Sequence, residues 1–245
     1  MFNINVMLGG KTKLITNYGI LEAEKIYEIL KENDIYLLTK NLKWKKILCA
    51  ERKKEKTIKV HTERGIIEIS KDQKILTKIG NSYVKIPIQK AYENFYKLLS
   101  IRKIPEKIIS IKSKKIAYLI AKIISGKYVN YNFDSMLLIP KFLNNLESFI
   151  LSLDYSSTKT FIKNVTEINE FTKNAIILAY LKLGYLVRFE NEKIKKEKLK
   201  DRYEIYLIEE GEEDYLYNFE IFSKNDKEKS FVALTNEYLP IVLSY

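Results

Sequence analysis

The sequence predicts a mostly β protein whose β domain is interrupted by a helical insert. Residues 1–90 and 215–245 contain short runs in which β-branched and aromatic side chains alternate with polar ones, as in half-buried strands. Between them, residues 105–208 contain apolar stretches of helical length. The chain has 245 residues, of which 46% are hydrophobic and 30% charged. This composition is globular, and the length is sufficient to bury a core.

Turn residues separate the predicted strands of the first β segment. Hairpin turns are expected at Glu63–Gly65 and at Gly80–Asn81 because glycine adopts the backbone conformations of tight turns. A helix is expected over residues 20–31. The expected strands span residues 12–16, 35–39, 42–47, 57–61, 65–70, 74–77 and 83–86.

The middle of the chain is expected to be mainly helical. Helices are predicted at residues 91–101, 114–125, 140–153 and 167–182, the first ending before Pro105 and the last at Gly184. Strands at 185–190 and 203–208 flank a charged loop or ribbon tip at 192–201, and strands resume from residue 215. The predicted domains are a β domain of residues 1–104 and 209–245, and an insert of residues 105–208.

The composition excludes several classes of protein. The chain has one cysteine, Cys49, and one histidine, His61, which exclude a disulfide framework, a cysteine-based zinc site and a histidine-rich metal centre. We expect Cys49 to be a small buried side chain and His61 to be hydrogen-bonded within a sheet. There is no run of about 18 apolar residues and no signal-peptide pattern. A cytoplasmic monomer is therefore expected, with no membrane partner and no small-molecule substrate.

Positive charge is concentrated in the first 200 residues. The net charge of +12 divides into +19 over residues 1–200 and −7 over residues 201–245. A field of this kind attracts a polyanion such as nucleic acid. Solvated lysine faces are the alternative interpretation.

Four segments of the β part carry a resemblance to a known family. Residues 7–16 (MLGGKTKLIT) resemble a block that normally opens with a nucleophile, and residues 60–77 (VHTERGIIEISKDQKILT) resemble a block with a Thr-x-x-His core. Residues 217–221 (YNFEI) with 229–233 (KSFVA), and then 241–245 (IVLSY), resemble the last two blocks. In this order the segments resemble an intein. The resemblance implies a mostly β Hint-like (hedgehog/intein) domain that is discontinuous in sequence.

The insert carries a second resemblance. Residues 116–129 (IAYLIAKIISGKYV) and 153–157 (LDYSS) resemble the motif helices of LAGLIDADG homing endonucleases. This implies an inserted α+β LAGLIDADG-like subdomain of reduced size.

Protein splicing needs a nucleophile, hydrogen-bonding catalytic groups and a terminal asparagine, and the resemblance places other residues at those positions. A thioether at the nucleophile position and a phenol at the terminal position cannot perform acyl transfer, and loss of a nucleophile alone costs on the order of 10⁶ in rate. We therefore expect no splicing. The degenerate splicing positions are Met7, Ser70, Gln73, Lys229, Ser244 and Tyr245.

The nuclease half departs from its family in the same way. LAGLIDADG enzymes hold Mg²⁺ with one acidic residue at the end of each motif helix. Here the resemblance places Gly126 at the first position and Ser156 at the second, with Asp154 two residues earlier. We therefore expect no resident metal or other cofactor. An active Mg²⁺-dependent endonuclease that uses Asp154 and Asp134 is the alternative.

The sequence thus predicts a stand-alone, catalytically inactive intein-like protein that binds double-stranded DNA. A non-enzymatic module whose acidic residues 209–214 dock a protein partner is a further alternative. The candidate DNA contacts are a tryptophan among lysines and a second lysine run, which would stack on a base and follow phosphates. They are Trp44, Lys43, Lys45, Lys46, Lys193, Lys195, Lys196 and Lys198.

Overall fold

The computed structural model describes residues 6–102, 104, 170–182, 184–190, 193–222 and 229–244. Its chain divides into two compact units. The first comprises Met1–Asn17, Leu21–Ile101 and Lys200–Tyr245, and the second comprises Tyr18–Ile20 and Arg102–Leu199. Residues 200–208, which the sequence interpretation assigned to the insert, therefore belong to the first unit. The predicted helices at 114–125 and 140–153 lie outside the described residues.

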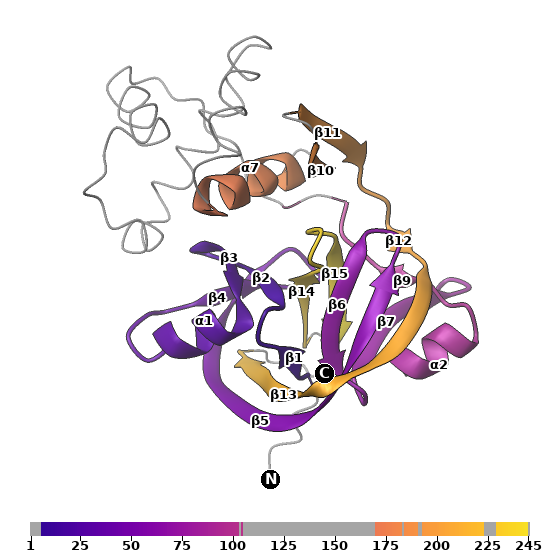
Figure 1. Cartoon of the computed structure of the whole chain (residues 1–245), viewed down its shortest axis with the longest axis horizontal. Coiled ribbons are helices and arrows are strands. Elements are labelled where there is room, and N and C mark those ends of the chain that lie inside the picture. Colours follow the sequence, from indigo (N-terminus) through magenta and orange to yellow (C-terminus); the bar gives the residue numbers. More distant parts are fainter. Residues whose placement is uncertain are drawn as a thin grey trace. The chain divides into compact units, whose positions relative to one another are not determined.

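The first unit is mostly β, as predicted (Figure 1). Eleven of the described strands join in the order β13-β1-β6-β5-β4-β2-β14-β15-β7-β8, with β3 paired to β2. A further pairing joins β13 to β5, so that β13, β1, β6 and β5 form a closed ring of paired strands. The strands of this path are β1 (Leu8–Gly9), β2 (Lys13–Thr16), β3 (Gly19–Glu22), β4 (Tyr36–Leu38), β5 (Trp44–Thr62), β6 (Gly65–Ser70), β7 (Lys74–Ile79), β8 (Ser82–Pro87), β13 (Ile205–Ile221), β14 (Ser230–Leu234) and β15 (Pro240–Ser244).

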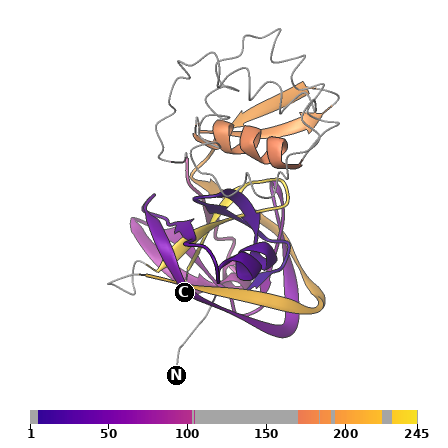
Figure 2. The ribbon, with the colours of Figure 1, turned by 90° about the vertical axis from the view of Figure 1, so that its left-hand side faces the viewer.

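A long ribbon of β5 and β13 is the largest feature of this unit. The two strands pair antiparallel from Ile205 opposite Thr62 to Ile221 opposite Ile47. Figures 1 and 2 show it as a curved arm, and we refer to it as the β5–β13 ribbon. Acidic residues of β13 face lysines of β5, with Glu209 opposite Lys59 and Glu213 opposite Lys56. The acidic segment 209–214 is therefore a paired strand, in which Glu209 and Glu213 face lysines while Glu210 faces Ile58 and Asp214 faces Glu55.

The sequence interpretation broke this ribbon into separate strands and was wrong there. Residues 48–56 and 209–214 were expected to lie outside strands because they are rich in charged side chains of low β propensity. The two segments lie opposite each other in the ribbon, where each provides backbone hydrogen-bond partners for the other. Opposite charges directly across the strands, such as Glu213 and Lys56, stabilise this pairing further. Tertiary pairing has overridden local propensity.

Two predicted helices are also shorter than expected. The helix at 20–31 is α1 (Ala23–Ile29), preceded by β3, because the Ala23 amide donates to Thr12 O at 2.9 Å and holds the chain extended before it. The helix at 91–101 is replaced by α2 (Ile88–Glu93) and the two-residue strand β9 (Leu98–Leu99). Phe95 stops α2 with a φ of 55°, and β9 pairs with β12 (Arg202–Tyr203).

The described part of the second unit is a helix followed by a hairpin. Helix α7 (Glu170–Lys182) matches its prediction and ends at Gly184, whose φ is 84° and whose amide donates to Leu181 O at 3.1 Å. Strands β10 (Tyr185–Glu190) and β11 (Lys193–Lys198) pair antiparallel. The charged segment 192–201, predicted as a loop or ribbon tip, therefore contains a strand whose partner supplies its backbone bonds.

The core of the first unit is built by alternate faces of its strands and by fully buried strands. Leu14, Phe219 and Phe231 have no exposed surface, and every residue of β14 and β15 is buried. Because β14 and β15 lie inside the sheet path, between β2 and β7, they pass through the middle of the core. Polar side chains that end these strands are consequently buried as well.

Candidate functional site

Five of the six positions assigned to splicing by resemblance meet in the first unit. Four hydrogen bonds connect them in sequence: Ser70 N donates to Met7 O at 2.9 Å, and Gln73 N to Ser70 O at 3.1 Å. Gln73 Nε2 donates to Ser244 O at 3.1 Å, and Ser244 Oγ to Lys229 O at 3.3 Å. We call this group the buried junction. Tyr245, the sixth position, lies outside the described residues.

Strand ends create the buried junction. Ser70 is the last residue of β6, and β7 begins at Lys74, so Gln73 lies in the connection between them. Ser244 is the last residue of β15, where it is opposite both Lys74 of β7 and Ser230 of β14. Backbone pairing therefore brings the β6–β7 connection together with the β14–β15 pair, which is far from it in the sequence.

Gln73 is the central side chain of the buried junction. It has no exposed surface, and its Nε2 also donates to Lys74 O. Its Oε1 accepts no hydrogen bond from any described residue. An amide in this place fixes two carbonyl groups but cannot take up or release a proton near neutral pH. Gln73 can therefore hold the segments together, but it cannot act as an acid or a base.

The remaining groups lack the partners of an activated nucleophile. Ser70 is 8% exposed, and its Oγ accepts a hydrogen bond from Asp72 N at 3.3 Å. Activation of a serine needs a base within hydrogen-bond reach, and no such bond to Ser70 Oγ occurs among the described residues. Met7 is half-buried and carries a thioether, which has no proton to lose.

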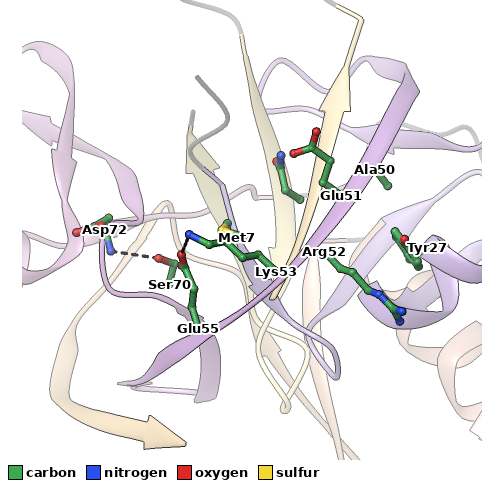
Figure 3. A pocket seen from close by; sticks show the side chains of 10 residues that line it. Met7, Tyr27, Ala50, Glu51, Arg52, Lys53, Glu55, Ser70 and Asp72 are labelled. Carbon is green, nitrogen blue, oxygen red and sulfur yellow. Dashed lines mark hydrogen bonds and ion pairs between the residues drawn. The ribbon is translucent and has the colours of Figure 1, made fainter. Parts of the chain in front are cut away.

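A pocket of about 660 Å³ opens beside Met7 and Ser70 (Figure 3). Strand β5 supplies most of its wall, α1 contributes Tyr27, and β13 contributes Asn218. In Figure 3, Lys53 joins Glu55 near Ser70, and Arg52 extends toward Tyr27. The lining residues are Met7, Tyr27, Ala50, Glu51, Arg52, Lys53, Glu55, Ser70, Asp72 and Asn218.

Sequence reasoning assigned no role to the pocket residues of β5 or to Asn218. One signal was present in the sequence: Asn218 is a polar residue within an otherwise apolar and aromatic run, Tyr215 to Phe219. Asn218 is 2% exposed, and its Oδ1 has no hydrogen-bond donor among the described residues. Buried polar atoms are almost always paired in native proteins. The unpaired Oδ1 therefore distinguishes Asn218 from the other residues that line the pocket.

Cys49 and His61 each contact a glutamate of β13. Cys49 was expected to be buried and is exposed, because β5 turns this side chain outward beside Glu220. Partial desolvation, and then the hydrogen bond to Glu220 at 3.3 Å and its charge, raise the pKa of the Cys49 thiol to about 11. His61 lies in the β5–β13 ribbon, as expected for a sheet histidine, with Nε2 2.7 Å from Glu209 Oε2.

The lysines around Trp44 do not form one continuous surface. Because side chains alternate along a strand, Lys45 points to the opposite face from Trp44 and Lys46. Lys46 Nζ is 2.6 Å from Asp34 Oδ1, and Lys45 Nζ lies 6.0 Å from the centre of the Phe222 ring. Lys43, just before the strand, is exposed.

The second lysine run lies on the β10–β11 hairpin of the second unit. Lys195 is directly opposite Arg188, and Lys196 is opposite Val187. Lys195, Lys196 and Lys198 are exposed, and Lys193 begins the strand. Two cations directly across a hairpin repel each other. Glu197 Oε2, 3.9 Å from the Arg188 guanidinium, offsets part of that repulsion.

The nuclease positions Gly126, Asp154 and Ser156 lie outside the described residues, as does Asp134. Within the described ranges, no three His, Cys, Asp or Glu side chains gather closely enough to hold a metal ion. None of the described helices combines the length and apolar character needed to cross a membrane.

Comparison with known proteins gives structural neighbours only. No protein-family model matches the sequence, and no curated protein is significantly similar to it.

The similar solved structures include inteins and an intein-like domain. The gp41-1 intein is 12% identical with a TM-score of 0.45, and the alignment covers 98% of this chain and 99% of that one. The transcription factor IIB Mvu mini-intein is 11% identical with a TM-score of 0.48, covering 98% and 100%. The bacterial intein-like domain from Clostridium thermocellum is 8% identical with a TM-score of 0.41, covering 98% and 99%. Likeness at this level assigns neither a family nor an activity to the chain.

Proposed function

We propose that the first unit is an intein-like domain that no longer splices. The observation that carries the proposal is the buried junction, where Met7, Ser70, Gln73, Ser244 and Lys229 are joined by consecutive hydrogen bonds. These are the positions that the sequence resemblance assigns to splicing, and they come from distant parts of the chain. Their meeting in one place supports descent from a splicing domain, and their side chains support the loss of its chemistry.

The first step of splicing lacks both its nucleophile and its acid in this chain. In splicing, a thiol or hydroxyl at residue 7 attacks the carbonyl carbon of Val6, the C–N bond breaks, and the amine leaves with a proton. Met7 has no such group, and neither Gln73 nor Ser70 supplies an acid for the leaving amine. The domain is accordingly proposed to be a stable scaffold.

The test places the chain between two reporter proteins. The unaltered chain should remain as a single fusion after prolonged incubation with and without thiol, measured by gel and intact mass. Ligated reporters or a released reporter would overturn the loss of splicing.

A restored variant tests descent from a splicing domain. Met7→Cys, Ser70→Thr and Gln73→His are combined in a Cys49→Ser background, so that residue 7 is the sole thiol. Addition of dithiothreitol should then release the upstream reporter. The matched control carries Met7→Ala with the other changes and should stay intact. A folded restored variant that releases nothing would contradict the proposal.

We propose DNA binding by the second unit as a second function. The supporting observation is the β10–β11 hairpin, where Arg188 faces Lys195 across the strands and Lys196 and Lys198 are exposed. Because side chains alternate along a strand, Arg188 and Lys195 lie on one face of the hairpin, where Glu197 is 3.9 Å from Arg188, and Lys196 and Lys198 lie on the other. Exposed cations on a hairpin are typical of a surface that binds phosphates. No DNA cleavage is proposed, because the resemblance places Gly126 and Ser156 at the acidic nuclease positions.

Salt-dependent binding to duplex DNA tests this second function. Affinity should fall between about 50 and 300 mM NaCl with a log–log slope of several units. Lys195→Gln should reduce the slope by about one, whereas Lys46→Gln, whose ammonium contacts Asp34, should leave it unchanged. Absence of binding at the lowest salt would refute the proposal, and cleavage on addition of Mg²⁺ would support the endonuclease alternative instead.

A further inference from the structure

The β7–β8 hairpin meets the connection between β4 and β5 at a lysine and a tyrosine. Lys40 lies in that connection, and its Nζ is 3.8 Å from the centre of the Tyr83 ring on β8. Four strands separate β4 from β8 in the order of the sheet, so the contact joins parts of the sheet that are not neighbours. Both residues belong to the first unit.

The two segments that meet there are basic and contain no acidic residue. Residues 35–50 hold four lysines and no Asp or Glu, and residues 73–92 hold another four, again with no Asp or Glu. The β5–β13 ribbon differs, because several of its lysines lie opposite glutamates. Positive charge where the two segments meet is therefore not balanced within either of them.

The register of the hairpin places more lysines around Tyr83. Lys78 is directly opposite Tyr83, and Lys85, two residues further along β8, has its side chain on the same face. Lys40, Lys78 and Lys85 are half-buried, so they lose less rotamer freedom on binding than fully exposed lysines do. We call these three lysines and Tyr83 the hairpin patch.

Lys40 is held in position without a carboxylate partner. Thr39 fixes the connection, because its amide and its hydroxyl donate to Lys43 O at 3.0 and 2.9 Å. The ammonium faces the Tyr83 ring and forms no ion pair within the described part of the chain. Burial lowers the pKa of Lys40 because it disfavours the charged form. An anion beside Nζ would supply the counter-charge that the fold does not.

Tyr83 adds an aromatic surface to these cations. Its side chain remains 54% exposed although Lys40 lies over one face of the ring. Proteins that bind single strands combine such rings, on which bases stack, with cations that contact the phosphates. In a duplex the base faces are already stacked on each other, so a protein ring reaches them only in unpaired segments. The combination therefore favours a single strand over a duplex.

We propose that the hairpin patch binds single-stranded nucleic acid, with a base stacked on the open face of Tyr83 and phosphates beside Lys40 and Lys78. Single-stranded DNA and RNA share both groups. This site lies on the first unit and needs unpaired bases, so it is separate from the duplex binding proposed for the β10–β11 hairpin. It is also independent of the loss of splicing, because none of these side chains takes part in the buried junction.

Fluorescence anisotropy of the full chain tests the site with labelled oligonucleotides of roughly 12 nucleotides. Oligothymidylate and oligouridylate are the probes, and an abasic deoxyribose phosphate chain of equal charge is the control. At about 50 mM NaCl at least one probe should bind about tenfold tighter than the abasic chain, and the tighter probe identifies the preferred sugar. Equal affinity for the abasic chain, or no binding of either probe, would overturn the proposal.

Tyrosine variants locate the stacking. Tyr83→Leu should weaken binding of the tighter probe about tenfold and leave duplex binding unchanged, whereas Tyr83→Phe keeps the ring and should keep the affinity. The matched control is Tyr206→Leu, which removes a tyrosine that is 60% exposed on the acidic strand β13. Unchanged affinity in Tyr83→Leu, or an equal loss in Tyr206→Leu, would refute the assignment.

Lysine variants test the phosphate contacts. Lys40→Gln and Lys78→Gln should each reduce the log–log salt slope by about 0.7, whereas Lys54→Gln, whose ammonium lies 3.9 Å from Glu213, should leave it unchanged. Lys195→Gln, on the second unit, should leave the preference for the probe over the abasic chain unchanged. Loss of that preference in Lys195→Gln would move single-strand binding to the second unit and overturn the proposal.

Discussion

The β5–β13 ribbon and the buried junction join distant parts of the chain by opposite means. The ribbon is long, charged and largely exposed, and it is held by backbone pairing with acidic residues of one strand opposite lysines of the other. The junction is compact and largely buried, and hydrogen bonds between uncharged side-chain and backbone groups hold it. A charge in the ribbon is therefore replaceable because water screens it, whereas a hydrogen-bond donor in the junction is not replaceable.

Among substitutions in the ribbon, one that disturbs steric fit should lower the stability of the fold more than one that removes a charge. A Cβ on Gly211 would overlap Thr57 Oγ1, at the bulge between Glu210 and Glu213. Gly211→Ala should therefore lower the free energy of unfolding by about 3 kcal/mol, measured by urea denaturation.

Two further variants check this explanation. Adding Thr57→Ala to Gly211→Ala should recover part of the loss because it removes the overlapping oxygen. Gly80→Ala is the control: no atom lies within 4 Å of its added Cβ, and its φ of 58° should cost only about 1 kcal/mol. Equal losses at Gly211 and Gly80 would show that the overlap has no part in the effect.

Removal of the central donor should break the buried junction. Gln73→Ala leaves Ser244 O and Lys74 O without their side-chain donor and opens a cavity. The free energy of unfolding should fall by about 2–3 kcal/mol. Gln73→Met keeps the volume and removes the unpaired Oε1 together with the donor, so it should cost less. A loss as large in Gln73→Met as in Gln73→Ala would mean that volume is unimportant here.

A smaller, pH-dependent effect is expected where the ribbon ends, at Glu63. Burial acts to raise its pKa, but hydrogen bonds from Lys200 and from the Glu204 amide, together with the charges of Lys200 and Lys97, bring the pKa below its ordinary value of 4.5. The carboxylate therefore stabilises the fold above pH 4.5, and this contribution is lost as the pH falls through the lowered pKa.

Urea denaturation between about pH 3 and pH 7 measures this contribution. Glu63→Gln should be less stable than the unaltered chain by under about 1 kcal/mol at pH 7, and the two should converge at low pH. Lys200→Gln should flatten the same profile. A difference between Glu63→Gln and the unaltered chain that grows as the pH falls would have the wrong sign for this assignment.

The smallest effect is expected for an exposed ion pair within the ribbon. Lys54 Nζ lies 3.9 Å from Glu213 Oε2, and both side chains are more than half exposed. Lys54→Gln should change the free energy of unfolding by less than about 0.5 kcal/mol. A larger loss, persisting in high salt, would mean that the ribbon depends on individual charges after all.

Local pattern was enough to predict the short strands and not enough to predict the ribbon. β2, β6, β14 and β15 were found because their alternation or apolar character is a property of a few adjacent residues. The charged centres of β5 and β13 have no such property. The centre of β5 is a strand only because β13 pairs with it, and the same holds in reverse. The two segments are too far apart in the sequence for a pattern of neighbouring residues to show this pairing.

The candidate site divides in the same way. Met7, Ser70, Gln73, Lys229 and Ser244 were selected because they fall at motif positions, and the fold brings them together. Arg52 and Asn218 were not selected for the pocket because their significance depends on what surrounds them. An arginine between two tyrosines and an amide oxygen without a donor are properties of the folded chain.

The span of the ribbon also governs when the protein can fold during synthesis. Cys49 of β5 and its partner Glu220 of β13 are 171 residues apart. At about 5–20 residues per second, translation takes roughly ten to thirty seconds to supply the second strand after the first. Throughout that interval the lysine-rich centre of β5 has no partner strand, and its like charges keep it from pairing with another copy of itself. The charges that contribute little to the finished fold would thus protect the nascent chain.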